Sequence, residues 1–213
     1  MTFISNIQYI THDTPAFSHA QQAKEVISGG IKWVQFRSKD LSSIEKKEAA
    51  IATVHVCREL GAKCIINDDI LLAKEIKADG VHIGKNDMHP IQARQILGED
   101  FIIGGTANTL EDIRQLVKAG IDYIGCGPFR FTSTKKNLSP TLGLEGYHRL
   151  MQQCRVEGID IPVVGIGGIL LEDLPALMNT GLFGIAISSV VLNSKDISHM
   201  SREFTKNISL SFQ

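Results

Sequence analysis

The sequence lacks several features that would point to particular classes of protein. Its four cysteines form no C-x-x-C pair, and the histidine spacing around them fits no zinc site. No apolar run is long enough to span a bilayer, and no basic tract indicates nucleic acid. Residues 1–13 contain no lysine or arginine and make a poor signal peptide. We therefore expect a cytoplasmic protein with reduced, mostly buried thiols and with neither membrane nor nucleic acid as partner.

The composition is that of an ordinary globular protein. Hydrophobic residues make up 43% of the chain, charged residues make up 21%, and the net charge is −1. A chain of 213 residues is long enough to bury one sizeable core. Since no linker or low-complexity segment interrupts it, we predict one domain over residues 1–213.

Short apolar runs recur along the whole chain, and a helix-like segment follows each. Most of these runs are continuous rather than alternating, which is typical of strands buried on both faces. The runs predict eight strands, at residues 7–12, 32–38, 63–68, 80–84, 101–107, 122–128, 162–168 and 184–191.

Helix signals lie between the runs. Asp13 or Thr14 can cap a first helix with Pro15 at its first position. Ser42 and Glu45 have the spacing of a capping box. Residues 193–213 are expected to form a last helix and a tail, packed on the protein itself or on a partner. Further signals are Asp69 and Thr109 as caps, and Gly29, Gly61, Gly120 and Gly181 where helices should end.

Eight strand–helix units predict an α/β fold, a (β/α)8 TIM barrel. The alternative is a doubly wound open sheet, which places a glycine-rich loop after the first strand. Here the first strand runs into "YITHDTP", which contains no glycine. The barrel is therefore the favoured fold, and its active site should lie at the carboxyl ends of the strands.

Cationic side chains follow the second predicted strand. Gln35, Arg37 and Lys39 alternate along the chain, so they can share one face. A single arginine or lysine there would more often be an ordinary surface cation. Two cations and an amide on the same face favour a clamp for an anion.

Carboxylates follow the third and fourth strands. Asp68 and Asp87 can converge, because neighbouring strands lie about 4.8 Å apart. Two acids beside a cation clamp indicate Mg²⁺, held by carboxylates and by substrate phosphates. His82 lies within the fourth strand, where a lone histidine is more often a packed core residue than a catalyst.

A second anion site is expected over the last strands. The run at 162–168 ends in "GIGG" and the next run contains "ISS", the usual place for a phosphate in such barrels. Between the two sites, "GPFRFTSTKKN" at 127–137 offers Thr132, Thr134 and Lys135 as phosphate contacts. A barrel that gathers a metal-bound diphosphate and a second phosphorylated molecule can join the two molecules and release pyrophosphate.

The residues at these positions resemble the thiamine-phosphate synthase family. The similarity covers most of the chain, from about the second strand to the eighth. The combination of T-x-T-K with both aspartate positions is specific, whereas "PVVGIGGI" is common among phosphate-binding barrels. The motifs that carry it are "VQFRSK", "INDD", "ADGVHIGKND", "DYIGCGPFRFTSTKK" and "PVVGIGGI".

This resemblance implies two substrates, a hydroxymethylpyrimidine diphosphate and a thiazole phosphate or its carboxylated form. It implies Mg²⁺ on Asp68 and Asp87, and catalytic roles for Arg37, Lys39 and Lys135 in stabilising the departing pyrophosphate. The pyrimidine diphosphate would contact Gln35, Phe36, Arg37, Ser38, Lys39, Asn67, Thr106 and Lys135, and the thiazole phosphate would contact Thr132, Ser133, Thr134, Gly168, Ile187 and Ser188.

The chain departs from the family pattern at three positions. Lys85 stands where the family commonly has Gln, Thr106 where it has Ser, and Phe36 where it has Leu. A thiazole tautomerase on the same barrel is one alternative function, and a non-catalytic binder of thiamine precursors is another. The sequence leaves open whether the chain forms a homo-oligomer and which thiazole it prefers.

Overall fold

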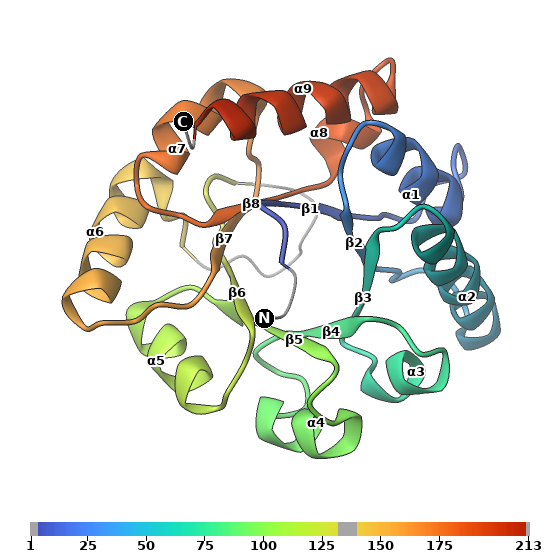
Figure 1. Ribbon diagram of the computed structural model, residues 1–213, viewed down its shortest axis with the longest axis horizontal. Helices are drawn as coiled ribbons and strands as arrows, with labels where there is room; N and C mark the ends of the chain where they lie inside the picture. Colours follow the sequence, from blue (N-terminus) through green and yellow to red (C-terminus); the bar gives the residue numbers. More distant parts are fainter. Residues whose placement is uncertain (1–3, 132–139, 212–213) are drawn as a thin grey trace.

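The computed structural model describes residues 4–131 and 140–211. Its strands form a closed barrel in which each strand runs parallel to the next and the last pairs with the first (Figure 1). The predicted TIM barrel is therefore confirmed. The strands are β1 (Ile7–Ile10), β2 (Trp33–Phe36), β3 (Lys63–Asn67), β4 (Gly80–Ile83), β5 (Ile102–Ala107), β6 (Tyr123–Cys126), β7 (Val163–Ile166) and β8 (Gly184–Ile187).

Helices surround this barrel on its outer side (Figure 1). Each strand is followed by at least one helix before the next strand begins, as the repeating sequence pattern predicts. The helices are α1 (His19–Ser28), α2 (Ser43–Glu59), α3 (Ile70–Glu75), α4 (Pro90–Leu97), α5 (Leu110–Lys118), α6 (Gly143–Val156), the 3-10 turn η1 (Leu171–Asp173), α7 (Leu174–Met178), α8 (Ser189–Leu192) and α9 (Ile197–Leu210).

The sequence signals for helix starts hold at three of these helices. The side chain of Ser42 accepts a hydrogen bond from the amide of Glu45, completing the predicted capping box of α2. Thr109 caps α5 in the same way, and Asp69 caps α3. Each cap satisfies backbone N–H groups that have no partner within the helix.

The predicted start of the first helix is wrong. Helix α1 begins at His19, with a capping box between Ser18 and Gln21, and not at Pro15 behind Asp13 or Thr14. The reason is that the carboxylate of Asp13 serves another segment, accepting hydrogen bonds from the amides of Lys39 and Asp40. Residues 13–17 therefore form a connection and not a first helical turn.

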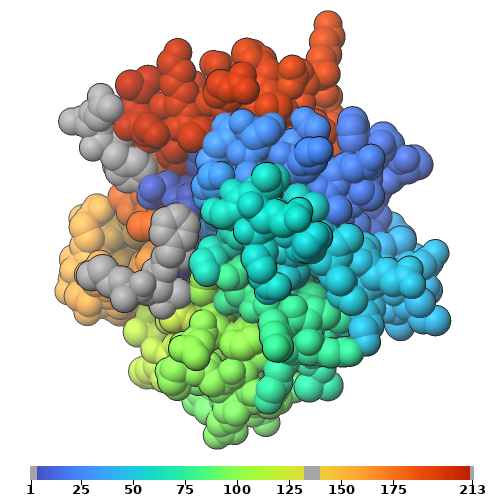
Figure 2. Space-filling model, turned by 45° about the vertical axis from the view of Figure 1, so that its right-hand side comes forward, coloured from blue at the N-terminus to red at the C-terminus, as the bar shows by residue number. Residues whose placement is uncertain are grey.

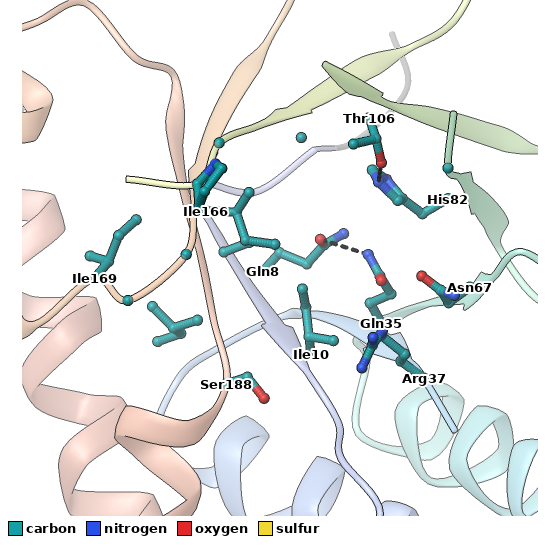
Figure 3. A pocket seen from close by; sticks show the side chains of 18 of the residues that line it. Gln8, Ile10, Gln35, Arg37, Asn67, His82, Thr106, Ile166, Ile169 and Ser188 are labelled. Carbon is teal, nitrogen blue, oxygen red and sulfur yellow. Dashed lines mark hydrogen bonds between the residues drawn. The ribbon is translucent and has the colours of Figure 1, made fainter. Parts of the chain in front are cut away.

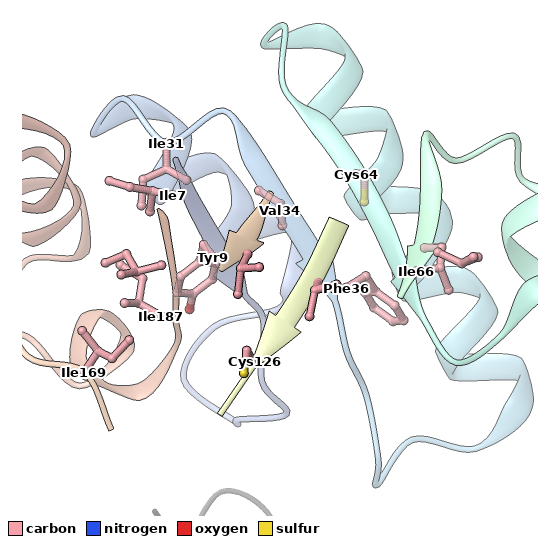
Figure 4. Close-up of a cluster of buried hydrophobic side chains, with 14 of the residues drawn as sticks. Ile7, Tyr9, Ile31, Val34, Phe36, Cys64, Ile66, Cys126, Ile169 and Ile187 are labelled. Carbon is pink, nitrogen blue, oxygen red and sulfur yellow. The ribbon is translucent and has the colours of Figure 1, made fainter. Parts of the chain in front are cut away.

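Two hydrophobic layers hold the barrel. Between strands and helices, alternate strand residues such as Val34, Phe36 and Ile66 are fully buried (Figure 4). Inside the barrel, Trp33 of β2 and Tyr123 of β6 meet edge to face with ring centroids 4.7 Å apart. Since β2 and β6 are not neighbours in the barrel, this contact crosses its interior. It fills the barrel near the amino ends of these two strands.

Gly104 makes this interior packing possible. A Cβ atom at this position would come within 2.1 Å of the ring of Tyr123. A glycine within a strand often lets another group, such as a ligand, approach the backbone closely. For Gly104 the group that approaches is a buried core side chain instead.

The last helix packs on the protein itself. Ser198 of α9 accepts a hydrogen bond of 2.9 Å from Ser28 at the end of α1. Gly29 lies so close to α9 that a Cβ atom there would come within 2.4 Å of Ser201. Figure 2 shows the C-terminal segment, in red, against the blue N-terminal part of the chain.

Two further sequence expectations concern the whole chain. The four cysteines are buried and form no disulfide, as expected. Within residues 4–131 and 140–211, no helix has both the length and the apolar character that crossing a membrane requires.

Candidate active site

A cavity of about 580 Å³ opens at the carboxyl ends of the strands (Figure 3). This is the end of the barrel where the sequence analysis placed the active site. Most of the described candidate residues line this one cavity, although they come from six different strands or the loops after them. They are Gln35, Arg37, Lys39, Asn67, Asp68, Asp87, Thr106, Gly168, Ile187 and Ser188.

Two candidate residues lie elsewhere. Phe36 is fully buried outside the barrel, where its ring lies 4.6 Å from the ring of His19. Successive side chains of a strand point to opposite faces, so Phe36 faces away from the cavity that Gln35 and Arg37 line. Ser38 is not among the lining residues. Thr132, Ser133, Thr134 and Lys135 fall outside the described residues.

A hydrogen-bonded chain of polar side chains, which sequence reasoning missed as a unit, forms the floor of the cavity. His82 contacts the hydroxyl of Thr106 at 3.0 Å and that of Tyr123 at 2.9 Å. Gln8 donates to the hydroxyl of Tyr123 at 3.2 Å and accepts from Gln35 at 3.0 Å. Burial raises the pKa of Tyr123, which keeps its hydroxyl protonated. These contacts hold the side chain of Gln35 at the floor of the cavity.

The sequence held one signal for this floor. Gln8 is a polar residue within the apolar run of the first strand, and it shares a face with Ile10 two residues later. Both line the cavity, as do Asn108 and Ile169. A buried polar residue inside an apolar run should find hydrogen-bond partners, and Gln8 finds them.

The carboxylates of Asp68 and Asp87 converge as predicted. The backbone of Asp68 has a φ of 63°, which directs the chain into a tight turn after β3. Asp87 accepts a hydrogen bond of 2.9 Å from the amide of Gly84. A Cβ atom on Gly84 would lie 2.6 Å from Asp87 Oδ2 and 3.8 Å from Asp68 Oδ1. The absence of a side chain there lets both carboxylates approach.

This proximity shows in the protonation of Asp68. Its pKa is raised to about 6, first because its surroundings reduce its hydration and second because Asp87 hydrogen bonds to it and adds like charge. Asn67 and the charge of Arg37 oppose this effect. A carboxylate pair in this state is suited to a cation, because a positive charge between the two groups removes their repulsion.

The cations of the cavity differ in their surroundings. Burial lowers the pKa of the Arg37 guanidinium, and the charges of Asp68 and Asp13 oppose that effect. Lys85 also lines the cavity, but its ammonium group forms a salt bridge of 2.6 Å with Asp112 at the start of α5. Lys85, one of the three residues that depart from the family pattern, therefore ties the loop after β4 to a neighbouring helix.

The side chain of Arg130 supports the glycine loop after β7. Gly167 and Gly168 have φ values of 103° and 68°, which favour glycine at both positions. Arg130 donates to the carbonyl of Gly168 at 2.8 Å and forms a two-point salt bridge with Asp173. This loop faces the start of α8, where Ser188 and Ser189 also line the cavity.

Comparisons with known proteins agree on one family. A family model described as thiamine monophosphate synthase matches residues 7–191. The thiamine-phosphate synthase of Phocaeicola vulgatus is 51% identical over 190 residues, which cover 89% of this chain and 91% of that protein. That of Flavobacterium psychrophilum is 43% identical over 204 residues, covering 96% and 99%.

Solved structures give the same result. The thiamine phosphate pyrophosphorylase of Pyrococcus furiosus matches with a TM-score of 0.85 and 29% identity, covering 98% of each chain. A structure titled "Native KDPGal structure" matches with a TM-score of 0.75 at 16% identity and shows the shared fold alone. The matched length, the identity to the relatives and the barrel lead to one conclusion: this chain belongs to the thiamine-phosphate synthase family, transferases of thiamine biosynthesis.

Proposed function

We propose that this cavity joins 4-amino-2-methyl-5-hydroxymethylpyrimidine diphosphate to 4-methyl-5-(2-phosphoethyl)thiazole or its 2-carboxy form. In this reaction the bond from the pyrimidine methylene to the diphosphate oxygen breaks. A bond from the same carbon to the thiazole nitrogen forms. The products are thiamine phosphate and pyrophosphate, so the reaction is an alkyl transfer.

One observation carries this proposal. The cavity has Arg37, Lys39 and the paired carboxylates of Asp68 and Asp87 at one side, and the glycine loop with Ser188 at the other. The first set suits a diphosphate with its metal, and the second suits a single phosphate. An enzyme that used one phosphorylated substrate would need only the second set.

The residues present fit Mg²⁺. Asp68 and Asp87 offer oxygen ligands, and the raised pKa of Asp68 supports a cation between them, because a positive charge would offset the repulsion that Asp87 adds. Among residues 4–131 and 140–211, no group of three or more acidic, histidine or cysteine side chains is arranged to hold a metal. Mg²⁺ typically takes one or two carboxylates and completes its shell with water and substrate phosphates. When bound, it would neutralise charge on the diphosphate.

The protein residues act mainly through charge and position. Arg37 and Lys39 stabilise the negative charge that develops on the departing pyrophosphate, an effect worth several kcal/mol per preorganised group. The aminopyrimidine itself stabilises the cation left on the methylene carbon through its amino group. No protein nucleophile is needed. Thr106 and the residues of the floor would hold the pyrimidine in line with the thiazole nitrogen.

The remaining roles rest on the sequence resemblance. Lys135 would add a further positive charge to the leaving group, and Thr132, Ser133 and Thr134 would bind the thiazole phosphate. The four free cysteines support a reducing compartment, and we place the protein in the cytoplasm. A homo-oligomer is compatible with the proposal.

The proposal is tested by measuring pyrophosphate release from purified protein. The assay contains both substrates with Mg²⁺, both substrates with a chelator, and each substrate alone with Mg²⁺. We expect release only in the first reaction, with thiamine phosphate formed in equal amount. Release with the pyrimidine diphosphate alone would indicate a hydrolase and contradict the proposal.

Two other outcomes would point to the alternatives. Isomerisation of the carboxylated thiazole phosphate without pyrophosphate release would indicate a tautomerase. Binding of the thiazole phosphate with no turnover under any condition would indicate a non-catalytic binder. Both would leave the convergence of Arg37, Lys39, Asp68 and Asp87 without a function.

A further inference from the structure

Three polar side chains, two from the segment after β1 and one from the first residue of α1, lie behind the loop after β2, which carries Arg37 and Lys39. Thr11 is fully buried, and the side chain of His19 is 5% exposed. Asp13 is also largely covered, with 12% of its side chain exposed. None of the three lines the cavity. Their proximity to the loop after β2 was not expected from the sequence, where Asp13 was a candidate helix cap.

These side chains hold three backbone amides of that loop. The amide of Arg37 donates to Thr11 Oγ1 at 3.1 Å. The amides of Lys39 and Asp40 donate to Asp13 Oδ2 at 2.6 and 3.1 Å. The held segment therefore begins at Arg37, contains Lys39 and ends at Asp40, so it includes both residues that supply cations to this side of the cavity.

His19 joins the two holding groups into one unit. Its Nδ1 lies 2.7 Å from Thr11 Oγ1, and its Nε2 lies 2.9 Å from Asp13 Oδ1. An ionised carboxylate can only accept, so Nε2 carries the proton and donates to Asp13. In a neutral imidazole, Nδ1 then accepts from the hydroxyl of Thr11, which still accepts from the Arg37 amide.

The protonation of the group agrees with this assignment. Burial alone would raise the pKa of Asp13, but hydrogen bonds from the amides of Lys39 and Asp40 and from His19 outweigh it and lower the pKa to about 2. Burial lowers the pKa of His19 and so favours its neutral form. The ring of Phe36 packs on His19 at 4.6 Å and limits its movement.

We propose that Thr11, His19 and Asp13 are positioning residues, which hold the backbone of residues 37–40 so that Arg37 and Lys39 face the diphosphate. The inference rests on the proposed function for its effect on turnover. Long cationic side chains lose much conformational freedom on binding. A backbone fixed beforehand reduces that cost, and outer residues of this kind typically change affinity or activity by about 10- to 100-fold.

The test uses Asp13→Asn and Thr11→Val, since the second removes a holding group without changing charge. For both variants we expect kcat/KM for the pyrimidine diphosphate to fall about 10- to 100-fold. KM for the thiazole phosphate should stay within about 2-fold, because the glycine loop lies on the other side of the cavity. Thr11→Ser restores the hydroxyl and should restore kcat/KM.

Asp79→Asn is the matched control. Asp79 also accepts a backbone amide, that of Cys64 at 2.9 Å, and it pairs with Lys63 at 2.7 Å. It lies at the opposite end of the barrel, before β4. We expect this variant to lose stability without changing kcat/KM for either substrate. Equal kinetic losses in Asp79→Asn and Asp13→Asn would show a general structural effect and overturn the proposal.

A measurement without substrates separates this inference from the proposed function. Hydrogen exchange at the amides of Arg37, Lys39 and Asp40 should be faster in Thr11→Val and Asp13→Asn than in the unaltered protein. Unchanged exchange would overturn the proposal even in an active enzyme. If the unaltered protein makes no thiamine phosphate, the proposed function fails, and faster exchange would still establish the holding contacts.

Discussion

Carboxylates at the two ends of the barrel have very different hydrogen-bond and charge partners. At the amino ends of the strands, Asp79 and Asp122 each accept a backbone amide and pair with a cation, Lys63 and Arg94 respectively. At the carboxyl ends, Asp68 faces Asp87, and its pKa is raised to about 6. The first arrangement satisfies the charge and stabilises the fold. The second leaves charge to be neutralised by something that binds, which is the expected property of a site.

Asp13 shows that the distinction depends on partners and not on the end of the barrel alone. It lies near the cavity end, yet its hydrogen bonds hold its pKa at about 2. It resembles the carboxylates at the far end in being satisfied. It differs from them in what it holds, namely the loop with the cavity cations.

The largest effect is expected from Asp68→Asn. On the proposed function, Asp68 would hold the Mg²⁺ that neutralises the leaving group, so its replacement should lower kcat by at least about 100-fold. Stability should not fall at pH 7, because a group with a raised pKa in the folded state opposes folding once it is ionised. The measurements are pyrophosphate release and thermal unfolding.

The pH dependence gives the sharper form of this first test. Between pH 4 and 6 the folded protein binds the extra proton, so the contribution of Asp68 to stability declines as pH rises through this range. The Asn variant should lack this decline. A lower melting temperature at pH 7, together with retained activity, would make Asp68 a structural residue like Asp79.

The second effect concerns Asp13 and acid. Its pKa is about 2 in the folded protein, against about 3.9 when unfolded. The difference contributes about 2 kcal/mol of stability, present above pH 4 and lost as pH falls through 2. The difference in the free energy of unfolding between the unaltered protein and Asp13→Asn, measured by urea unfolding, should therefore narrow as the pH falls from 6 to 2.5. A difference in the free energy of unfolding that stays constant with pH would show that Asp13, unlike Asp79 and Asp122, is not a carboxylate whose charge is stabilised by its contacts.

The third effect is on stability alone. Asp79→Asn should cost about 1–3 kcal/mol, because it weakens one hydrogen bond to an amide and one ion pair in a partly buried setting. Chemical unfolding measures the loss, and kinetics with both substrates should be unchanged. A kinetic effect larger than about 3-fold would erase the difference between the two ends of the barrel.

The smallest effect is expected from Lys85→Gln, which restores the residue common in the family. The Lys85–Asp112 pair is partly exposed, with 40% and 23% of the two side chains accessible. Such pairs contribute less than about 1 kcal/mol, so thermal unfolding should change little. Activity should remain within about 3-fold. A larger loss would mean that Lys85 acts on a substrate phosphate and not only on Asp112.

The sequence by itself determined the strands, the barrel and many of the residues that line the cavity, though not its floor. Apolar runs marked each strand, and residues towards the ends of those runs or just after them proved to line one cavity. Alternation of side chains along a strand also explains why Phe36 does not line the cavity. Gln35 and Arg37 share one face, so the residue between them has to point into the outer core. The interpretation of Phe36 as a substrate contact followed the family motif and not this geometry.

Only the tertiary structure decided which partners the polar residues find. Asp13 had the local features of a helix cap, but it bonds to amides 26 and 27 residues away in the chain. Gly104 leaves room for the ring of Tyr123, and Lys85 pairs with Asp112. These partners too are distant in the chain. Periodicity reports the face on which a residue lies. Its partner depends on which loops the closed barrel brings together, and no local pattern contains that information.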